Sequence, residues 1–163
     1  MPISCHVPSP LGELILLSDD STKRLAGLWI AGEKHSPTED IDWQRDDAAL
    51  PQVRRQLKEY FSGKRMTFEV PLAPIGTPFQ MLAWQALQAI PYGTTMSYGQ
   101  QAAAIGKPAA CRAIGLANGR NPISIIVPCH RVIGASGALT GYGGGLAAKR
   151  WLLDHEARHR TLN

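Results

Sequence analysis

Residues 97–118 read SYGQQAAAIGKPAACRAIGLAN, and this stretch decides the fold of the second half of the chain. Ser97 and Gln100 have the S-x-x-Q spacing of a capping box, which predicts a helix that ends near Ile105. A Gly-Lys-Pro turn follows, and Pro108 opens a second helix that runs almost to the end of the stretch. Two short helices joined by a glycine-containing turn are the outline of a helix-turn-helix, although an ordinary helical hairpin has the same pattern.

The second helix of this pair has an unusual composition for a reader of DNA bases. Its residues 109–117 are mainly alanine and glycine, with Arg112 as the one long polar side chain. Side chains that hydrogen-bond to base edges in the major groove, such as Asn, Gln or Lys, are missing from its first turns. Small residues let a helix backbone approach closely, so the composition favours contact with a minor groove.

The residues before this stretch predict a small lobe that mixes strands and helices. Short apolar runs at 14–17 and 25–30 predict an antiparallel hairpin. Residues 31–46 are polar and include Pro37, so a loop is expected there. Apolar residues at helical spacing predict a helix over 48–61, closed by Gly63, and alternation predicts a further strand over 67–70.

Prolines at positions 71, 74 and 78 mark a connection between two lobes. We therefore predict an N-terminal α+β lobe over residues 1–76 and a helical C-terminal lobe over residues 77–163. Thr77 and Pro78 are an N-cap followed by proline at the first helical position, which predicts a helix to about Ile90. A last helix is expected over 147–155.

Charge is divided unevenly between the two halves. Residues 1–77 hold 9 Lys/Arg and 11 Asp/Glu, a balance of −2, whereas residues 78–163 hold 8 Lys/Arg and 2 Asp/Glu, a balance of +6. A basic second half favours a polyanionic partner. No apolar run is long enough to span a bilayer and no secretory signal is found, so no membrane partner is expected.

The chain has three cysteines, Cys5, Cys111 and Cys129. This small, odd number does not indicate a disulfide framework. Reduced thiols in a cytoplasmic protein are the simpler explanation. Cys129 differs from the other two because a proline precedes it, and because His130 and Arg131 follow it. A predicted strand or extended segment over 123–127 leads into this run.

Cys129 is a candidate nucleophile, although most free cysteines are simply small buried hydrophobic residues. A free thiol has a pKa of about 8.5, so a base must remove its proton at neutral pH. His130 is the candidate base, directly or through a water molecule, and Glu156 is the candidate for the group that orients its ring. The glycine-rich run at 141–145 lets backbone N–H groups approach a ligand closely.

These residues resemble a known family. The run NPISIIVPCHRVIG at residues 121–134 is similar to the active-site signature of the O6-alkylguanine-DNA alkyltransferases of the bacterial single-unit type, and so are GYGGG at 141–145 and KRWLLDHE at 149–156. The close similarity covers residues 77–156, while the N-terminal lobe resembles the family only in length and outline. The resemblance implies an α+β protein, with a ribonuclease H-like N-terminal lobe and a helical lobe that carries the helix-turn-helix and the reactive cysteine.

The resemblance also implies a reaction. Cys129 would take the alkyl group irreversibly, in a single turnover, from O6-alkylguanine and also from O4-alkylthymine in duplex DNA. His130, through water, and Glu156 would form the thiolate, Tyr98 would protonate the purine as it leaves, and Asn121 would order the active-site turn. The main chain at Cys129 and Val132 would accept from the guanine amino group.

The alkylated oxygen lies inside the base stack, so the nucleotide must be flipped out of the helix. By resemblance Arg112 would fill the gap that the nucleotide leaves. The residues expected at the DNA surface are Ser97, Arg112, Ala113, Gly115 and Arg131. The residues expected to line the substrate pocket are Ser124, Val132, Tyr142 and Gly143.

Two pocket positions depart from the human-type members, which have proline at Ser124 and serine at Gly143. The zinc ligands of those members have no counterpart in this chain, so no metal and no cofactor are expected, and the protein is expected to be a monomer. Two other functions remain open: a lesion-binding protein that transfers nothing, and a thiol hydrolase built on Cys129, His130 and Glu156.

Overall fold

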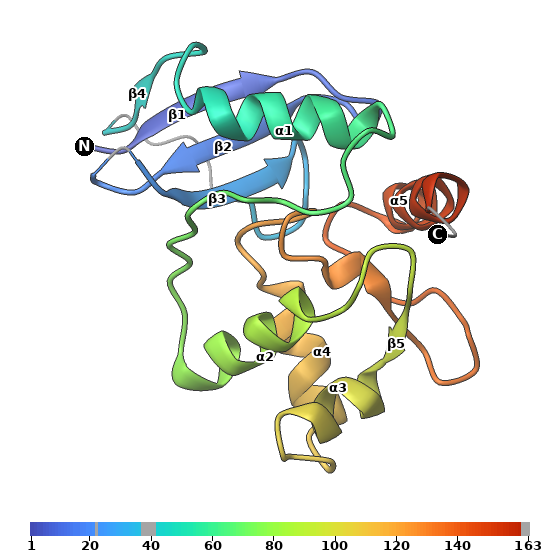
Figure 1. Cartoon of the computed structure of the whole chain (residues 1–163). Coiled ribbons are helices and arrows are strands. Elements are labelled where there is room, and N and C mark those ends of the chain that lie inside the picture. Colours follow the sequence, from blue (N-terminus) through green and yellow to red (C-terminus); the bar gives the residue numbers. More distant parts are fainter. Residues whose placement is uncertain (22, 37–41, 161–163) are drawn as a thin grey trace.

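The computed structural model describes residues 1–21, 23–36 and 42–160. Figure 1 shows a sheet crossed by one helix above a group of short helices, with the last helix beside the junction of the two parts. The predicted α+β class is confirmed. Within the described residues, no helix is long and apolar enough to cross a membrane.

The upper part is a sheet with the strand order β3-β2-β1-β4. Its strands are β1 (Ile3–Val7), β2 (Leu14–Ser18), β3 (Leu25–Ile30) and β4 (Gln44–Arg45). The predicted hairpin is confirmed as the antiparallel pair β2 and β3. The two residues of β4 pair in parallel with β1 and lie inside the predicted 31–46 loop, of which residues 37–41 are outside the described residues.

Helix α1 (Pro51–Phe61) lies across one face of this sheet (Figure 1). Its apolar residues follow helical spacing, and Val53, Leu57 and Tyr60 are buried. The prediction of a helix here is confirmed, with Pro51 in the first turn, where a missing N–H costs nothing.

The prediction of a strand over 67–70 is wrong. The side-chain amide of Gln56 donates to the carbonyl of Glu69 at 3.2 Å and accepts from its N–H at 2.8 Å. The side chain of Gln52 donates to the same carbonyl at 3.0 Å. Because helix side chains satisfy this backbone, the segment crosses the lobe without joining the sheet.

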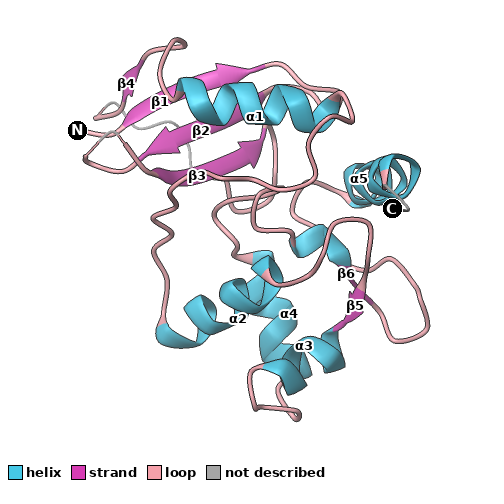
Figure 2. Cartoon of the chain, in the orientation of Figure 1, coloured by secondary structure: helices cyan, strands magenta, loops and turns pink. Residues whose placement is uncertain are grey.

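The lower part is helical, as predicted (Figure 2). Its elements are α2 (Pro78–Gln88), β5 (Met96–Ser97), α3 (Tyr98–Ala104), α4 (Cys111–Gly119), the 3-10 helix η1 (Cys129–Arg131), β6 (Val132–Ile133) and α5 (Leu146–His159). Both N-caps behave as expected: Thr77 caps α2 and Ser97 caps α3, each in a reciprocal capping box with the glutamine three residues later.

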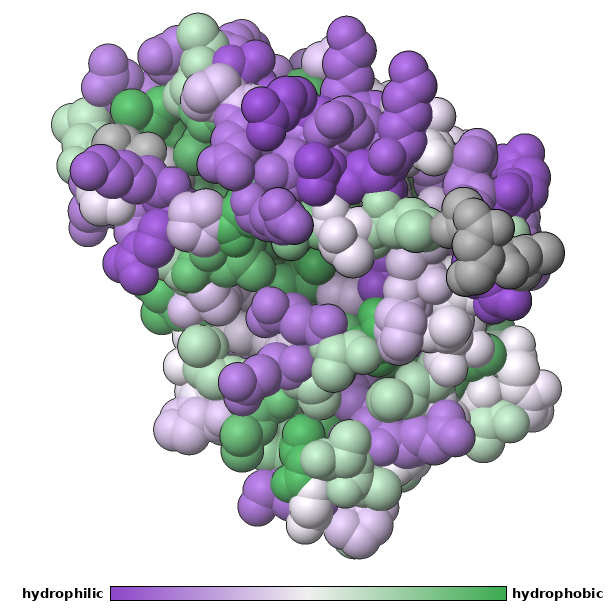
Figure 3. Space-filling model, viewed as in Figure 1, coloured by the Kyte–Doolittle hydropathy of each residue, from purple (hydrophilic) through white to green (hydrophobic). Residues whose placement is uncertain are grey.

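Helix α4 begins three residues later than predicted. Pro108 lies in the preceding turn, which closes when the N–H of Ala110 donates to the carbonyl of Lys107 at 2.9 Å. The pair α3 and α4 is still two short helices joined by a glycine-containing turn. Figure 3 shows hydrophilic side chains gathered over α1, whereas the surface over α2 to α4 is more apolar.

The edge of β3 connects the two parts of the molecule. Leu28 donates from its N–H to the carbonyl of Pro122 at 2.9 Å and accepts from the N–H of Ser124 at 3.0 Å. These bonds hold the start of the segment that leads to Cys129. The predicted strand over 123–127 is wrong beyond this point, because the chain forms a tight turn in which Ile125 has a φ of 73°.

Candidate active site

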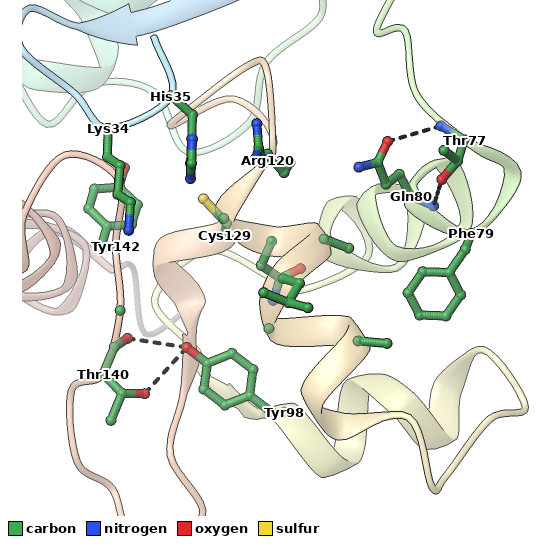
Figure 4. Close-up of a pocket in the computed structure, with 18 residues that line it drawn as sticks. Lys34, His35, Thr77, Phe79, Gln80, Tyr98, Arg120, Cys129, Thr140 and Tyr142 are labelled. Atoms are coloured by element: carbon green, nitrogen blue, oxygen red, sulfur yellow. Dashed lines mark hydrogen bonds between the residues drawn. The ribbon is translucent and has the colours of Figure 1, made fainter.

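Cys129 begins η1 directly after this turn and is 8% exposed. Its sulfur points into a cavity of about 920 Å³ (Figure 4). A cavity of this size can hold a small organic molecule or a nucleotide. Cys111 is exposed on α4, whereas Cys5 is buried in the sheet, so Cys129 is the described thiol that faces this cavity.

Asn121 holds the turn that leads into Cys129 through three hydrogen bonds of its side chain. Its side-chain amide donates to the carbonyl of Val127 at 2.8 Å and to Cys129 Sγ at 3.2 Å. Its oxygen accepts from the N–H of Ile123 at 3.0 Å. One side chain therefore closes the turn on both sides and also stabilises negative charge on the sulfur.

His130 and Glu156 form a buried pair behind the cysteine. His130 Nε2 lies 2.7 Å from Glu156 Oε2, and both side chains are almost completely buried. When Nε2 donates to the carboxylate, Nδ1 carries a lone pair, and this atom has no hydrogen-bond partner among the described residues. The ring is thus held as a neutral base with one accepting nitrogen free.

Glu156 accepts from further donors besides this histidine. Arg131 donates to it from Nε at 2.8 Å and from Nη2 at 3.1 Å, and Tyr60 donates its hydroxyl from α1 at 2.7 Å. Gly93 adds a main-chain N–H at 3.3 Å. Because α1 belongs to the upper part of the molecule, Glu156 joins both parts.

The prediction that Arg131 contacts DNA is wrong. The residue is 7% exposed, and its third nitrogen donates to the carbonyl of Ile90 at 2.7 Å. Each of the three guanidinium nitrogens therefore donates a hydrogen bond inside the protein. It compensates the buried charge of Glu156, a role that its place in the sequence did not reveal.

The ionisation of these groups follows from their burial. Burial raises the pKa of the Cys129 thiol to about 11, against the hydrogen bond from Asn121, so the resting thiol is protonated. Burial also lowers the pKa of His130, against the pull of Glu156, which keeps the ring neutral. Burial alone would raise the pKa of Glu156, but the hydrogen bond with His130 and the hydrogen bonds and charge of Arg131 outweigh it and hold that pKa well below its usual range.

The cavity in front of the sulfur is lined by α4 on one side and by residues 140–143 on the other. Tyr98 also lines it, and its hydroxyl donates to the carbonyl of Thr140 at 3.1 Å (Figure 4). Of the predicted pocket residues, Tyr142 and Gly143 line the cavity. Ser124 and Val132 are instead completely or almost completely buried.

Lys149 is a buried cation that no local pattern assigned to the site. Its ammonium group donates to the carbonyls of Val132 at 2.6 Å and Thr140 at 2.8 Å. It therefore ties the strand after η1 to the loop that lines the cavity. Its positive charge lowers the pKa of Cys129, although burial of the thiol is the larger effect.

Three further residues at the cavity were missed because they come from distant segments. Lys34 and His35 follow β3, and Arg120 follows α4, yet all three line the cavity (Figure 4). Only the three-dimensional fold brings them together. The mouth of the cavity thus carries positive charge from both parts of the molecule.

The other residues predicted at the DNA surface lie on or next to the helix pair. Arg112 and Ala113 are exposed on α4, and Gly115 is partly exposed on the same helix, where it lines the cavity together with Ala113. Ser97 caps α3 and is partly exposed. Leu116 is 70% exposed on α4, which is unusual for a leucine on a packed helix.

The chain is similar to known proteins over nearly its whole length. Residues 78–158 match the family model described as 6-O-methylguanine DNA methyltransferase, DNA binding domain, and residues 6–74 match the ribonuclease-like domain of the same name. A methylated-DNA–protein-cysteine methyltransferase of Mycobacterium leprae is 49% identical over 98% of this chain and 95% of its own. One from Methanosarcina acetivorans is 48% identical over 91% of this chain and 94% of its own.

Solved structures give the same result. The structure of Mycobacterium tuberculosis OGT in complex with DNA superimposes with a TM-score of 0.90 and 46% identity, covering 98% of this chain and 96% of that one. The O6-methylguanine methyltransferase of the same organism, solved separately, superimposes with a TM-score of 0.91 over 100% of this chain and 97% of that one.

Proposed function

Because this chain belongs to the 6-O-methylguanine DNA methyltransferase family, we propose that it repairs alkylated DNA by moving the alkyl group of O6-alkylguanine onto Cys129. The observation that carries the proposal is the sulfur of Cys129 at the base of the cavity, with a neutral histidine and a buried carboxylate behind it. By the same chemistry O4-alkylthymine is a second substrate. No cofactor takes part, because the acceptor is the protein itself.

The reaction is a single displacement at the alkyl carbon. The thiol proton passes to His130, through a water molecule, and Glu156 stabilises the charged ring that results. The sulfur then forms a bond to the alkyl carbon while the carbon–oxygen bond breaks, and the electron pair of that bond goes to the guanine. A proton from the Tyr98 hydroxyl neutralises the purine, and Tyr98 regains a proton from solvent, to which His130 releases the proton that it took from the thiol. A thioether is stable, so each molecule reacts once.

The high pKa of the resting thiol fits this scheme. A protonated Cys129 is protected from adventitious alkylation and oxidation, because the thiolate is the reactive form. The base, His130, is already neutral and already oriented by the time a substrate arrives.

The helix pair α3 and α4 is the proposed DNA-binding element. The sulfur is buried, so a base must leave the duplex to reach it. Small residues on α4, among them Ala113 and Gly115, allow close approach to a minor groove, and Arg112 occupies the gap in the stack. Lys34 and Arg120 at the mouth of the cavity add positive charge for the DNA backbone.

Two other functions are less well supported. A lesion binder would need the cavity but not a thiol with a base behind it, and here both are present. A thiol hydrolase would turn over many times and would need no DNA-binding helix pair. The protein is further proposed to act as a cytoplasmic monomer, since Cys129 must stay reduced to work.

The proposal is tested by intact mass spectrometry after incubation with a duplex that contains O6-methylguanine. We expect the protein to gain the mass of one methyl group and no more, and peptide mapping to place it on Cys129. An unmodified duplex is the control. No gain in mass would support the lesion binder, and release of product beyond one equivalent per protein would support a turnover enzyme; either result contradicts the proposal.

Arg112→Ala is expected to slow repair of duplex DNA by about tenfold to a hundredfold, because the unstacked base pair loses the side chain that fills its place. Reaction with free O6-benzylguanine base should change little, since no flipping is needed. The two rates are measured by the loss of unmodified protein with time. Arg150→Ala, which removes an exposed arginine on α5, is the matched control. Equal losses on duplex and free base would disprove the flipping role.

A further inference from the structure

A partly buried carboxylate from the upper part of the molecule stands directly behind the cavity wall. Glu33 follows β3, and its Oε1 accepts from the hydroxyl of Ser124 at 2.8 Å. Its Oε2 accepts from the N–H of Ile30 at 2.9 Å. Beside it, the N–H of Lys34 donates to the carbonyl of Gly143 at 2.9 Å. Glu33 therefore lies where three segments meet: the loop after β3, the active-site turn and the glycine-rich loop.

Glu33 and Gly143 are fitted to each other. A Cβ atom on Gly143 would lie 2.8 Å from Glu33 Oε1, which is closer than such atoms approach, and 3.1 Å from its Cγ, which is a tight contact. The carboxylate therefore occupies space that any side chain at position 143 would need. The backbone of Gly143 can form the cavity wall at this point because the residue has no side chain.

The charge of this carboxylate does not help to activate the thiol. Burial raises the pKa of Glu33 above its ordinary value, and its negative charge is one of the influences that raise the pKa of Cys129. A group that opposes thiolate formation is not a base for it. The role of Glu33 is structural: its contacts join Ser124 to the loop after β3 and place both against Gly143.

We propose that Glu33 is a positioning residue that sets the width of the alkyl pocket beside Cys129. It fixes the wall formed by Lys34, His35, Tyr142 and Gly143, so that a small alkyl group fits and a bulky one is disfavoured. The inference rests on the proposed function and adds to it the selectivity of the pocket. It also gives the N-terminal part of the molecule a direct role at the site.

The test compares two substrates of different size in the same duplex: O6-methylguanine and O6-benzylguanine. Glu33→Ala removes the support and opens space, so the ratio of the benzyl rate to the methyl rate should rise about tenfold. Glu33→Gln should keep the ratio of the original protein, because a glutamine oxygen accepts from Ile30 and its amide can donate to the Ser124 hydroxyl. Ser124→Ala should raise the ratio by a smaller factor, since it removes only one of the two bonds.

The outcomes separate the two proposals. If the unmodified protein accepts neither alkyl group, the proposed function fails. If it accepts methyl groups but Glu33→Ala changes both rates by the same factor, or if Glu33→Gln shifts the ratio as much as Glu33→Ala, only the role of Glu33 fails. Should Glu33→Ala unfold at the assay temperature, the ratio measured for Ser124→Ala decides: a rise supports the role, and an unchanged ratio overturns it.

Discussion

Cys129→Ser is expected to lose alkyl transfer by about 10³-fold or more while its affinity for duplex DNA stays within about twofold of the original. Serine occupies nearly the same volume, so the active-site turn and its Asn121 bonds can persist. A hydroxyl, however, is a much weaker acid and nucleophile than a thiol. Burial already raises the pKa of the Cys129 thiol to about 11. The same burial would raise the higher pKa of a serine hydroxyl further, so that His130 could not remove its proton.

The measurement follows mass gain on a methylated duplex and DNA affinity by fluorescence anisotropy with the same oligonucleotide. Cys111→Ser is the matched control, because that thiol is exposed on α4, next to the Arg112 that we propose contacts DNA, but does not line the cavity. We expect the control to transfer as fast as the original protein. Transfer by Cys129→Ser at much more than about a thousandth of the original rate, or an equal loss in Cys111→Ser, would place the nucleophile elsewhere.

Elements whose signals are local could be predicted from the sequence. The capping boxes at Thr77 and Ser97 fix the starts of α2 and α3, since the cap residue and its partner lie three positions apart. The apolar spacing of α1 is likewise contained in one segment. In these cases short-range hydrogen bonds and one buried face specify the structure, and the tertiary fold only adds to them.

The failures share a physical cause. The segment at 67–70 alternates like a strand, but its Glu69 N–H and carbonyl form hydrogen bonds with the side-chain amide of Gln56 instead of with a neighbouring strand. The apolar run at 123–127 pairs with Leu28 at one residue and then turns, because Asn121 binds both ends of the turn. Gln56 comes from α1 and Leu28 from β3, so neither of these pairings can be read from the run itself, whereas Asn121 lies only two residues before the turn that it holds.

The site divides in the same way. Cys129, His130 and Asn121 lie within nine residues of one another, so a single sequence motif identifies them as candidate site residues. Tyr60 comes from 96 residues before Glu156, and Glu33 from 91 residues before Ser124, so their contacts follow only from the packing of the two parts. Arg131 shows the opposite error: the sequence predicts it at the DNA surface, whereas in the fold its guanidinium binds the buried carboxylate of Glu156.

Glu156→Ala is expected to destabilise the protein by about 3–5 kcal/mol and to reduce alkyl transfer strongly. The variant leaves the Arg131 guanidinium buried without its counter-charge and the Tyr60 hydroxyl without its acceptor. It also removes the group that holds His130 in its ring orientation. Asp154→Ala is the matched control, since that acid lies exposed on the same helix, and it should change stability by less than about 0.5 kcal/mol.

The pH dependence of this loss distinguishes a lost charge from a merely lost contact. The folded pKa of Glu156 lies below its ordinary value of 4.5, so the unfolded chain binds its proton first as the pH falls. The stability that the carboxylate contributes is therefore complete well above that ordinary value and disappears as the pH falls below it. Urea unfolding at a series of pH values should show that the difference in free energy of unfolding between the original protein and Glu156→Ala becomes steadily smaller as the pH falls. If this difference in free energy is the same at every pH, Glu156 acts by packing alone. If it is below about 1 kcal/mol at neutral pH, Arg131 finds another partner when the carboxylate is gone.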